Sequence, residues 1–174
     1  MECSSIHVKP LILTALLDEK SQEFFNLKRK FFFPKNKNYI NAHLTLFHQL
    51  PNNKLKNIRE FLLSECSKIK VMHATVSSLM FLGFGTAYKI ECDELIFIRK
   101  KLVNQWHEML INQDLNHFVP HITIQNKVDP KQAKSTFLNI QEDFEPFDLD
   151  IIGLQLWYYE GGPWTHLENF TFML

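Results

Sequence analysis

Two short segments of the sequence place a histidine two residues before a threonine: His43-Leu44-Thr45-Leu46 and His121-Ile122-Thr123-Ile124. Imidazole has an unperturbed pKa of about 6.5, so at neutral pH one ring of a pair can accept a proton while the other donates one. A phosphodiester needs both transfers when one oxygen attacks and another leaves, and a threonine hydroxyl can donate to a phosphate oxygen. The two segments therefore predict phosphodiester chemistry without a metal ion.

The spacing within each segment separates the polar residues from their apolar neighbours. Side chains alternate between the two faces of a β-strand, so His43 and Thr45 share one face while Leu44 and Leu46 share the other. The second segment repeats the pattern residue for residue. We expect the apolar residues to anchor each strand on helices and the imidazoles and hydroxyls to face a common cleft.

A third match to the pattern, His73-Ala74-Thr75-Val76, also lies on a predicted strand. Another strand follows it, whereas a polar turn and a helix follow the other two matches, over Asn41–Cys66 and Val119–Ile140. The third match is therefore interpreted as coincidental, and the repeated strand-turn-helix unit indicates an internal duplication.

The elements that must position these residues follow from hydrophobic periodicity and turn signals. Strands are predicted at 7–17, 41–50, 71–81, 86–92, 117–125, 147–159 and 164–172, and helices at 18–33, 55–66, 93–110 and 129–140. Asp93 and Asp129 are expected near the starts of the last two helices, with Asp93 as an N-cap. The order of elements predicts an α+β fold in one domain over residues 1–174, with helices outside a sheet.

Composition narrows the partners and the compartment. Hydrophobic residues make up 45% of the chain and the formal net charge is zero, so no global basic field attracts long nucleic acid. A nucleic-acid substrate is therefore expected to be short or held at one end. The apolar run Leu11–Leu17 is too short for a membrane span and precedes no cleavage site. Three cysteines without CxxC spacing favour a reducing cytoplasm and no disulfide framework.

The paired motifs resemble those of the 2H phosphoesterase superfamily, and within it the 2'-5' RNA ligase-like proteins and RNA 2',3'-cyclic phosphodiesterases. Members carry two His-x-Thr/Ser motifs about 80 residues apart, and here His43 and His121 are 78 positions apart. Val119-Pro120 precedes the second motif, like the Pro-His pair common in the family. The segment Tyr159–Trp164 resembles the family's C-terminal hairpin.

The resemblance implies a bilobal fold, in which two pseudo-symmetric antiparallel-sheet lobes with outer helices surround a central cleft. It implies hydrolysis of 2',3'-cyclic phosphates or of 2',5'-phosphodiester bonds in RNA or nucleotides, or ATP-independent 2'-5' RNA ligation as the reverse reaction. By the same resemblance, His43 is the proton donor and His121 the acceptor, and Thr45 and Thr123 grip the phosphate.

The chain also departs from the family pattern. Several relatives place an arginine shortly after the second motif, where this chain has Gln125-Asn126-Lys127, so Lys127 is the candidate for a substrate contact as a point charge. Lys35, Lys37 and Tyr39 stand just before the first motif, where an arginine is also missing.

Further candidates are aromatic or basic. Trp164 and Tyr159 are candidates to stack on a base, since every base presents a π-face. The run Lys28-Arg29-Lys30, with Lys35 and Lys37, is interpreted as a solvated charged face rather than a site.

The other histidines show no metal-ligand spacing, and no glycine-rich phosphate loop occurs, so neither a metal nor a cofactor is expected. The expected partner is a short RNA end or a nucleotide, bound by a monomer. Two alternatives stay open: a non-catalytic RNA- or nucleotide-binding module on the same scaffold, and a structural protein.

Overall fold

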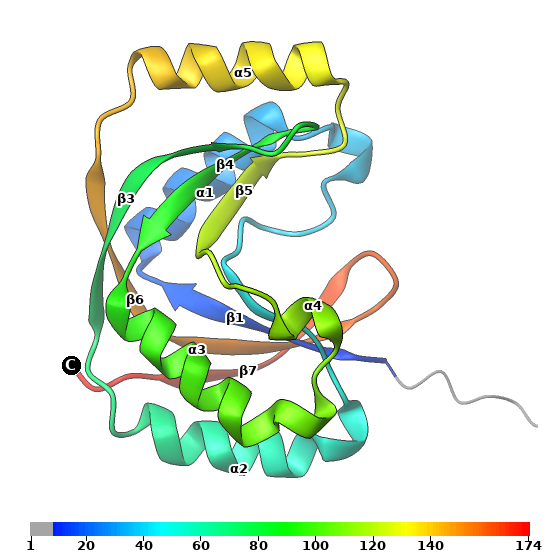
Figure 1. Cartoon of the computed structure of the whole chain (residues 1–174), viewed down its shortest axis with the longest axis vertical. Helices are drawn as coiled ribbons and strands as arrows, with labels where there is room; N and C mark the ends of the chain where they lie inside the picture. Colours follow the sequence, from blue (N-terminus) through cyan, green and yellow to red (C-terminus); the bar gives the residue numbers. More distant parts are fainter. Residues whose placement is uncertain (1–8) are drawn as a thin grey trace, which may run out of the picture.

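A computed structural model describes residues 9–174 (Figure 1). The strands of this part are β1 (Leu11–Leu17), β2 (Thr45–Leu50), β3 (Met72–Phe81), β4 (Thr86–Glu91), β5 (His121–Gln125), β6 (Phe147–Tyr159) and β7 (Trp164–Thr171). Its α-helices are α1 (Glu19–Phe32), α2 (Leu55–Cys66), α3 (Asp93–Trp106), α4 (Asn112–Leu115) and α5 (Pro130–Glu142), with short 3-10 turns at Lys35–Lys37, Asn52–Lys54 and His107–Met109.

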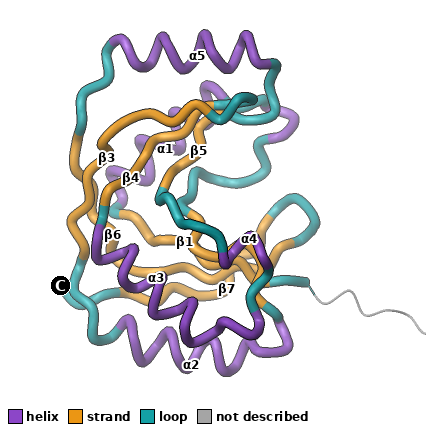
Figure 2. The backbone as a smooth tube through the Cα atoms, viewed as in Figure 1, coloured by secondary structure: helices purple, strands orange, loops and turns teal. Residues whose placement is uncertain are grey.

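One antiparallel sheet runs through all of these strands in the order β2-β1-β6-β3-β4-β5, and β7 is added on β6. The long strand β6 joins the two lobes. Its beginning, Phe147 to Ile151, pairs with β3, and its remainder pairs with β1 on one side and β7 on the other. The sheet curls so that β3, β4 and β5 form one lobe and β1, β2, β6 and β7 the other (Figure 2). The predicted bilobal α+β fold is confirmed, with β6 shared by both lobes.

The helices cover the lobes in a crossed manner. Helix α1 follows β1 in sequence but packs against the other lobe, where the Phe25 ring lies 5.5 Å from that of Tyr88 on β4. Helix α3 follows β4 but packs under β2, where the Trp106 ring lies 5.4 Å from that of Phe47. Each motif strand therefore rests on a helix from the other half of the sequence.

The helix starts follow local capping chemistry. Asp129 stands at the start of α5 as expected, and it is the N-cap, because its carboxylate accepts hydrogen bonds from the amides of Lys131 and Gln132 at 3.0 and 3.1 Å. The prediction of Asp93 as an N-cap was wrong, because Cys92 is the N-cap of α3. Asp93 is the first residue of the helix, where its negative charge interacts favourably with the positive end of the helix dipole. Helix α3 also ends at Trp106, before a 3-10 turn, rather than at 110.

Both motif strands begin later than predicted. β2 starts at Thr45 rather than at Asn41, and β5 starts at His121 rather than at 117. The reason at β2 is that the peptide groups of Ala42 bond to side chains of α1 and not to a neighbouring strand. The first predicted strand begins at Leu11, and residues 7 and 8 lie outside the described residues.

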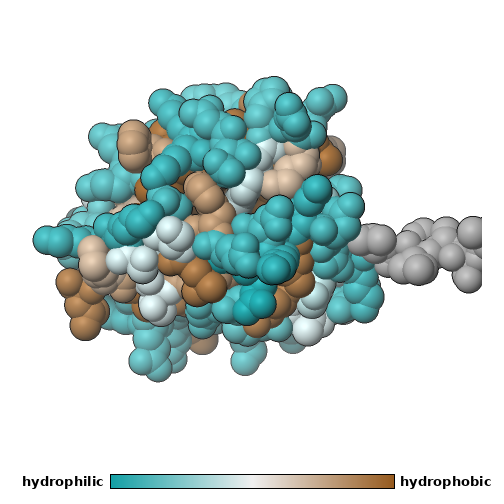
Figure 3. All heavy atoms as spheres, turned by 90° about the horizontal axis from the view of Figure 1, so that it is seen from below, coloured by the Kyte–Doolittle hydropathy of each residue, from teal (hydrophilic) through white to brown (hydrophobic). Residues whose placement is uncertain are grey.

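The core lies between the curled sheet and the helices. Helix α2 shows the pattern: Ile58, Leu62 and Cys66 are buried, and its polar residues face solvent. Figure 3, seen from below, shows hydrophilic atoms over much of this face with hydrophobic patches between them. Cys66 and Cys92 are buried and free, and Cys3 lies outside the described residues. No helix in residues 9–174 has the length and apolar character that a bilayer crossing needs.

Candidate active site

His43 lies two residues before the start of β2 with its ring half-buried. Its Nδ1 atom is 2.7 Å from the backbone carbonyl oxygen of Asn41. A carbonyl oxygen only accepts, so Nδ1 carries the hydrogen and the neutral ring keeps its free lone pair on Nε2. Leu44 and Leu46 are fully buried, so the predicted separation of polar and apolar faces holds for this segment.

Side chains of α1 hold the backbone next to His43. The amide of Ala42 donates to Asn26 Oδ1 at 2.9 Å, and Gln22 Nε2 donates to the Ala42 carbonyl at 2.9 Å. Gln22 Nε2 also donates to Asn26 Oδ1 at 3.0 Å, which fixes the two side chains relative to each other. The residue just before the first motif is thus held by a helix, whereas Thr45 and Leu46 of the motif lie in β2.

His121 repeats the ring geometry inside the sheet. Its Nδ1 atom donates to the carbonyl oxygen of Val119 at 2.8 Å, again the residue two positions earlier, which leaves Nε2 free. The strand is held by β4, where Lys89 pairs with His121 and the Ile90 amide donates to the Pro120 carbonyl at 2.9 Å. The two motifs therefore present their histidines in the same tautomer.

Arg29 of α1 connects the two motifs. Its Nε donates to the Ile40 carbonyl at 3.1 Å and to Asn38 Oδ1 at 2.9 Å, in the segment that leads into His43. Its Nη1 donates to the carbonyl of Thr123 at 2.9 Å, in the second motif. One guanidinium thus lies between the segment before the first motif and the strand of the second.

A cavity of about 600 Å³ opens beside His43. Helix α1, segment 38–43 and the β6–β7 hairpin line it, and the Trp164 ring lies 4.5 Å from the His43 ring. Trp157, whose ring is 6.1 Å from that of Trp164, is fixed by a 2.9 Å hydrogen bond from Nε1 to Thr14 Oγ1. Two indole rings therefore form one wall beside the imidazole.

Burial lowers the pKa of His43 from 6.5 to about 4. Arg29, and His121 and His48 when they are protonated, lower it further, while the hydrogen bond to Asn41 opposes the shift. His43 is therefore neutral at pH 7. Burial also lowers the pKa of Arg29 to about 10, so its guanidinium stays charged.

The two threonines stand at the same spacing from their histidines but at different places in their strands. Thr45 is the first residue of β2 and pairs with Thr14 of β1, and Thr123 is the third residue of β5 and pairs with Ala87 of β4. Both are half-buried, two residues after a histidine. The structure thus gives each motif an imidazole and a hydroxyl at the same spacing.

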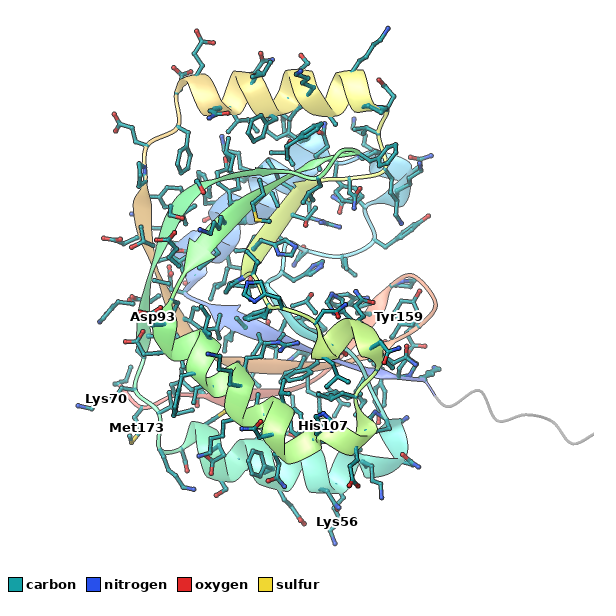
Figure 4. The ribbon with its side chains drawn as sticks, viewed as in Figure 1. Lys56, Lys70, Asp93, His107, Tyr159 and Met173 are labelled. Atoms are coloured by element: carbon teal, nitrogen blue, oxygen red, sulfur yellow. The ribbon has the colours of Figure 1, made fainter. Side chains whose placement is uncertain are left out.

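Of the predicted site residues, His43 and Trp164 line this cavity, whereas His121, Thr45, Thr123, Tyr159 and Lys127 are not among its lining residues. Tyr159 is the last residue of β6, at the base of the β6–β7 hairpin (Figure 4). Lys127 is exposed beyond the end of β5, with φ at 62°, and its carbonyl accepts a 3.2 Å hydrogen bond from Lys37 Nζ. Neither residue lines the cavity beside His43, and their contacts with substrate remain predictions.

The remaining histidine match lies elsewhere on the sheet. His73 is on β3, which β4 separates from β5, and its Nδ1 lies 2.6 Å from Asp150 Oδ1 with 84% of the side chain exposed. It borders a different cavity, of about 680 Å³, between β4 and α3. In the described residues, no group of three or more His, Cys, Asp or Glu side chains is placed to hold a metal ion.

The sequence interpretation missed Arg29, which it assigned to a solvated basic face. Arg29 is only 5% exposed, because it lies on the buried face of α1 with Ser21 and Phe25. That four-residue spacing was the available signal: a charged residue in line with a buried phenylalanine points inward. Lys28 and Lys30, which flank it, keep more contact with solvent.

Comparison with known proteins gives the family. The sequence model of the 2'-5' RNA ligase superfamily matches residues 17–163. No curated protein matches this sequence. Among solved structures, TT0787 of Thermus thermophilus is similar with a TM-score of 0.66 and 16% identity, over 93% of this chain and 97% of that one. E. coli LigT complexed with 3'-AMP is similar with a TM-score of 0.64 and 15% identity, over 95% and 99%.

A third similar structure, a phosphoesterase, has a TM-score of 0.60 and 17% identity over 95% of this chain and 99% of that one. At these identities the structures show the fold, and the family match covers most of the chain. The crossed α+β lobes, the paired motifs and this match agree: the chain belongs to the 2'-5' RNA ligase superfamily of 2H phosphoesterases.

Proposed function

We propose that this chain is a metal-independent phosphodiesterase that acts on 2',3'-cyclic phosphate or 2',5'-phosphodiester bonds of RNA or nucleotides. His43 and His121 form the acid–base pair, and Thr45 and Thr123 bind the phosphate. The observation that carries the proposal is the matched tautomer: each histidine donates Nδ1–H to the carbonyl two residues earlier, at 2.7 and 2.8 Å. Each free Nε2 is then the atom that exchanges a proton with substrate.

For a 2',3'-cyclic phosphate, the reaction needs one proton removed and one delivered. The neutral imidazole of one motif takes a proton from a water molecule as the water oxygen attacks phosphorus. The protonated imidazole of the other motif donates a proton to the departing 3' oxygen. The P–O3' bond breaks, leaving a 2'-phosphate and a 3'-hydroxyl. The two threonine hydroxyls donate to non-bridging oxygens, where negative charge builds up. The net reaction consumes one water molecule.

The pKa of His43 bears on the division of roles. In the free protein it is lowered to about 4, so His43 is in the form of a proton acceptor, opposite to the donor role that the resemblance implies. A bound phosphodiester adds a negative charge beside the ring and raises its pKa. His43 can therefore donate a proton only after bound substrate has raised its pKa, whereas it can accept a proton in the free protein as well.

The charge distribution suits an anionic substrate despite the zero net charge. Residues 24–59 and 115–128, which contain the two motifs, hold no aspartate or glutamate. Of the described residues that line the cavity beside His43, Glu23 alone carries a carboxylate. Trp164 offers a ring face for a base. The similar E. coli LigT structure holds 3'-AMP, which supports a nucleotide as the ligand here.

The test is turnover in EDTA of 2',3'-cyclic nucleotides, 2',5'-oligoadenylate and 3',5'-linked RNA. His43→Ala and His121→Ala are each expected to lower kcat/KM at least about 100-fold, the usual scale for a positioned acid or base. His73→Ala, the matched control on β3, should keep wild-type turnover. Full activity in both active-site variants contradicts the proposal. Tight binding without turnover favours the binding module, and joining of RNA ends without ATP favours the ligase.

A further inference from the structure

Arg29 is a buried cation without a buried anion beside it. It is 5% exposed, and no carboxylate of residues 9–174 lies within ion-pair distance of it. Removing a charge from water is costly unless hydrogen bonds replace the lost solvation. Here backbone carbonyls, an amide oxygen and the ring of Phe33, 3.9 Å from the guanidinium carbon, take the place of water.

The hydrogen bonds of Arg29 have acceptors close to both motif histidines in the sequence. Ile40 is three residues before His43, and Thr123 is two residues after His121. These two acceptors are otherwise far apart in sequence and belong to segments held by different supports, α1 side chains and β4. A guanidinium donates in several fixed directions from one plane, so it sets the spacing between its acceptors.

We propose that Arg29 is a positioning residue that holds the segment carrying His43 in register with the strand carrying His121. It touches neither ring and does not exchange protons with substrate. Its role is to fix how far apart and at what angle the two motifs lie. The kinetic part of its test rests on the proposed phosphodiesterase activity, and the structural part does not.

Arg99 of α3 offers a matched comparison. It is 7% exposed, and its Nε donates to the carbonyl of Leu46 in the first motif at 3.0 Å. Its other acceptor is the Asp114 carbonyl of α4, and its guanidinium carbon lies 4.8 Å from the Phe47 ring. Arg99 thus supports one motif strand, whereas Arg29 contacts both the segment before the first motif and the strand of the second.

Arg29 also acts on the charge of His43. The charged groups around this ring are Arg29, Glu23 and Lys30 on α1, His48 on β2 and His121 on β5. Arg29 is the one permanent cation among those that lower the pKa of His43, and Arg99 is not among them. A neutral side chain at position 29 therefore lets the pKa of His43 rise, while a lysine keeps the charge and loses the fixed fork.

The experiment compares Arg29→Lys, Arg29→Met and Arg99→Met with the full-length wild type. Without substrate, NMR follows the His43 titration and the hydrogen exchange of the Ala42 amide. Both Arg29 variants should speed exchange at Ala42, because the segment leading to it loses the hydrogen bonds from Arg29 to Asn38 and Ile40. Arg29→Met alone should raise the pKa of His43 from about 4. Arg99→Met should change neither quantity.

With substrate, Arg29→Lys should lower kcat about 100-fold with KM changed less than about 3-fold, since misplacement by about 1 Å has that effect. Unchanged Ala42 exchange in both Arg29 variants overturns the proposal, whether or not the protein turns over any substrate. If Arg29→Met does not fold, Arg29→Lys decides by exchange and kcat. Absence of wild-type turnover with the expected exchange result overturns the phosphodiesterase proposal and leaves the positioning role standing.

Discussion

The two motif segments reach one ring geometry by two different supports. Residues 41–44 precede β2: Asn26 and Gln22 of α1 hold Ala42, and the Leu44 carbonyl accepts a hydrogen bond from the Ala15 amide of β1. Residues 121–125 form an edge strand paired with β4. Yet both Nδ1 atoms donate to the carbonyl two residues earlier, at 2.7 and 2.8 Å. The orientation of each imidazole ring is therefore set by the backbone carbonyl two residues before it, whichever element holds the segment.

The surroundings do differ, in charge and in aromatic contacts. Trp164 lies 4.5 Å from His43, and burial with the charge of Arg29 lowers the pKa of this ring to about 4. The second motif meets Arg29 through the backbone carbonyl of Thr123. Similar motifs in different surroundings can thus perform different halves of one acid–base reaction.

The largest effect expected from this comparison concerns the hydroxyls, which the proposal treats as equivalent. Thr45→Val and Thr123→Val each remove one donor to the phosphate at nearly constant shape. Each should lower kcat about 100-fold, because a donor aimed at developing charge is worth that much. Thr165→Val, on the exposed part of β7, is the control. A fall in kcat in only one of the two threonine variants would show that only one hydroxyl binds the phosphate.

Much of this site follows from the sequence. Strand alternation placed His43 and Thr45 opposite Leu44 and Leu46, and these leucines are buried. The resemblance to the 2H phosphoesterases implied the two lobes, and the repeated strand-turn-helix unit indicated only a duplication. The Asp129-Pro130 pair identified the start of α5.

What sequence could not provide are contacts between distant segments. Nothing local links Arg29 with Thr123, 94 positions later, so a run of three basic residues looked solvated. The start of β2 was also predicted too early, at Asn41 instead of Thr45, since Ala42 bonds to helix side chains rather than to a strand. Both errors have one origin: α1 packs across the lobe boundary, which a one-dimensional pattern does not reveal.

A smaller effect is expected from removing the helix support of the first motif. Asn26→Ala leaves the Ala42 amide without its hydrogen-bond acceptor. An unsatisfied buried donor lowers the free energy of unfolding by about 1–3 kcal/mol. Turnover should fall between roughly 10- and 100-fold as His43 is displaced. The second motif, held by β4, should keep its amide exchange rates. Asn53→Ala, an exposed asparagine, is the control for thermal stability and kcat. Equally faster amide exchange in both motifs would contradict the inference that different elements hold the two motifs.

The smallest effect concerns Trp164, which gives the first motif its aromatic wall. Trp164→Ala should raise KM about 10-fold for a nucleoside 2',3'-cyclic phosphate, since stacking of a base on an aromatic ring is worth about 1–3 kcal/mol. A base-free ribose 2',3'-cyclic phosphate should show little change in KM, because it has no ring to stack. Phe31→Ala is the matched aromatic control, because Phe31 is an 81% exposed residue of α1.

Trp164→Phe should restore most of the affinity for the nucleoside substrate, because phenylalanine keeps a ring face at the position. If Trp164→Ala instead lowers kcat equally for both substrates, the indole acts on the His43 ring, 4.5 Å away, rather than on a base. In that case the asymmetry between the motifs lies in how each histidine is held, and base recognition must be sought on another part of the cleft.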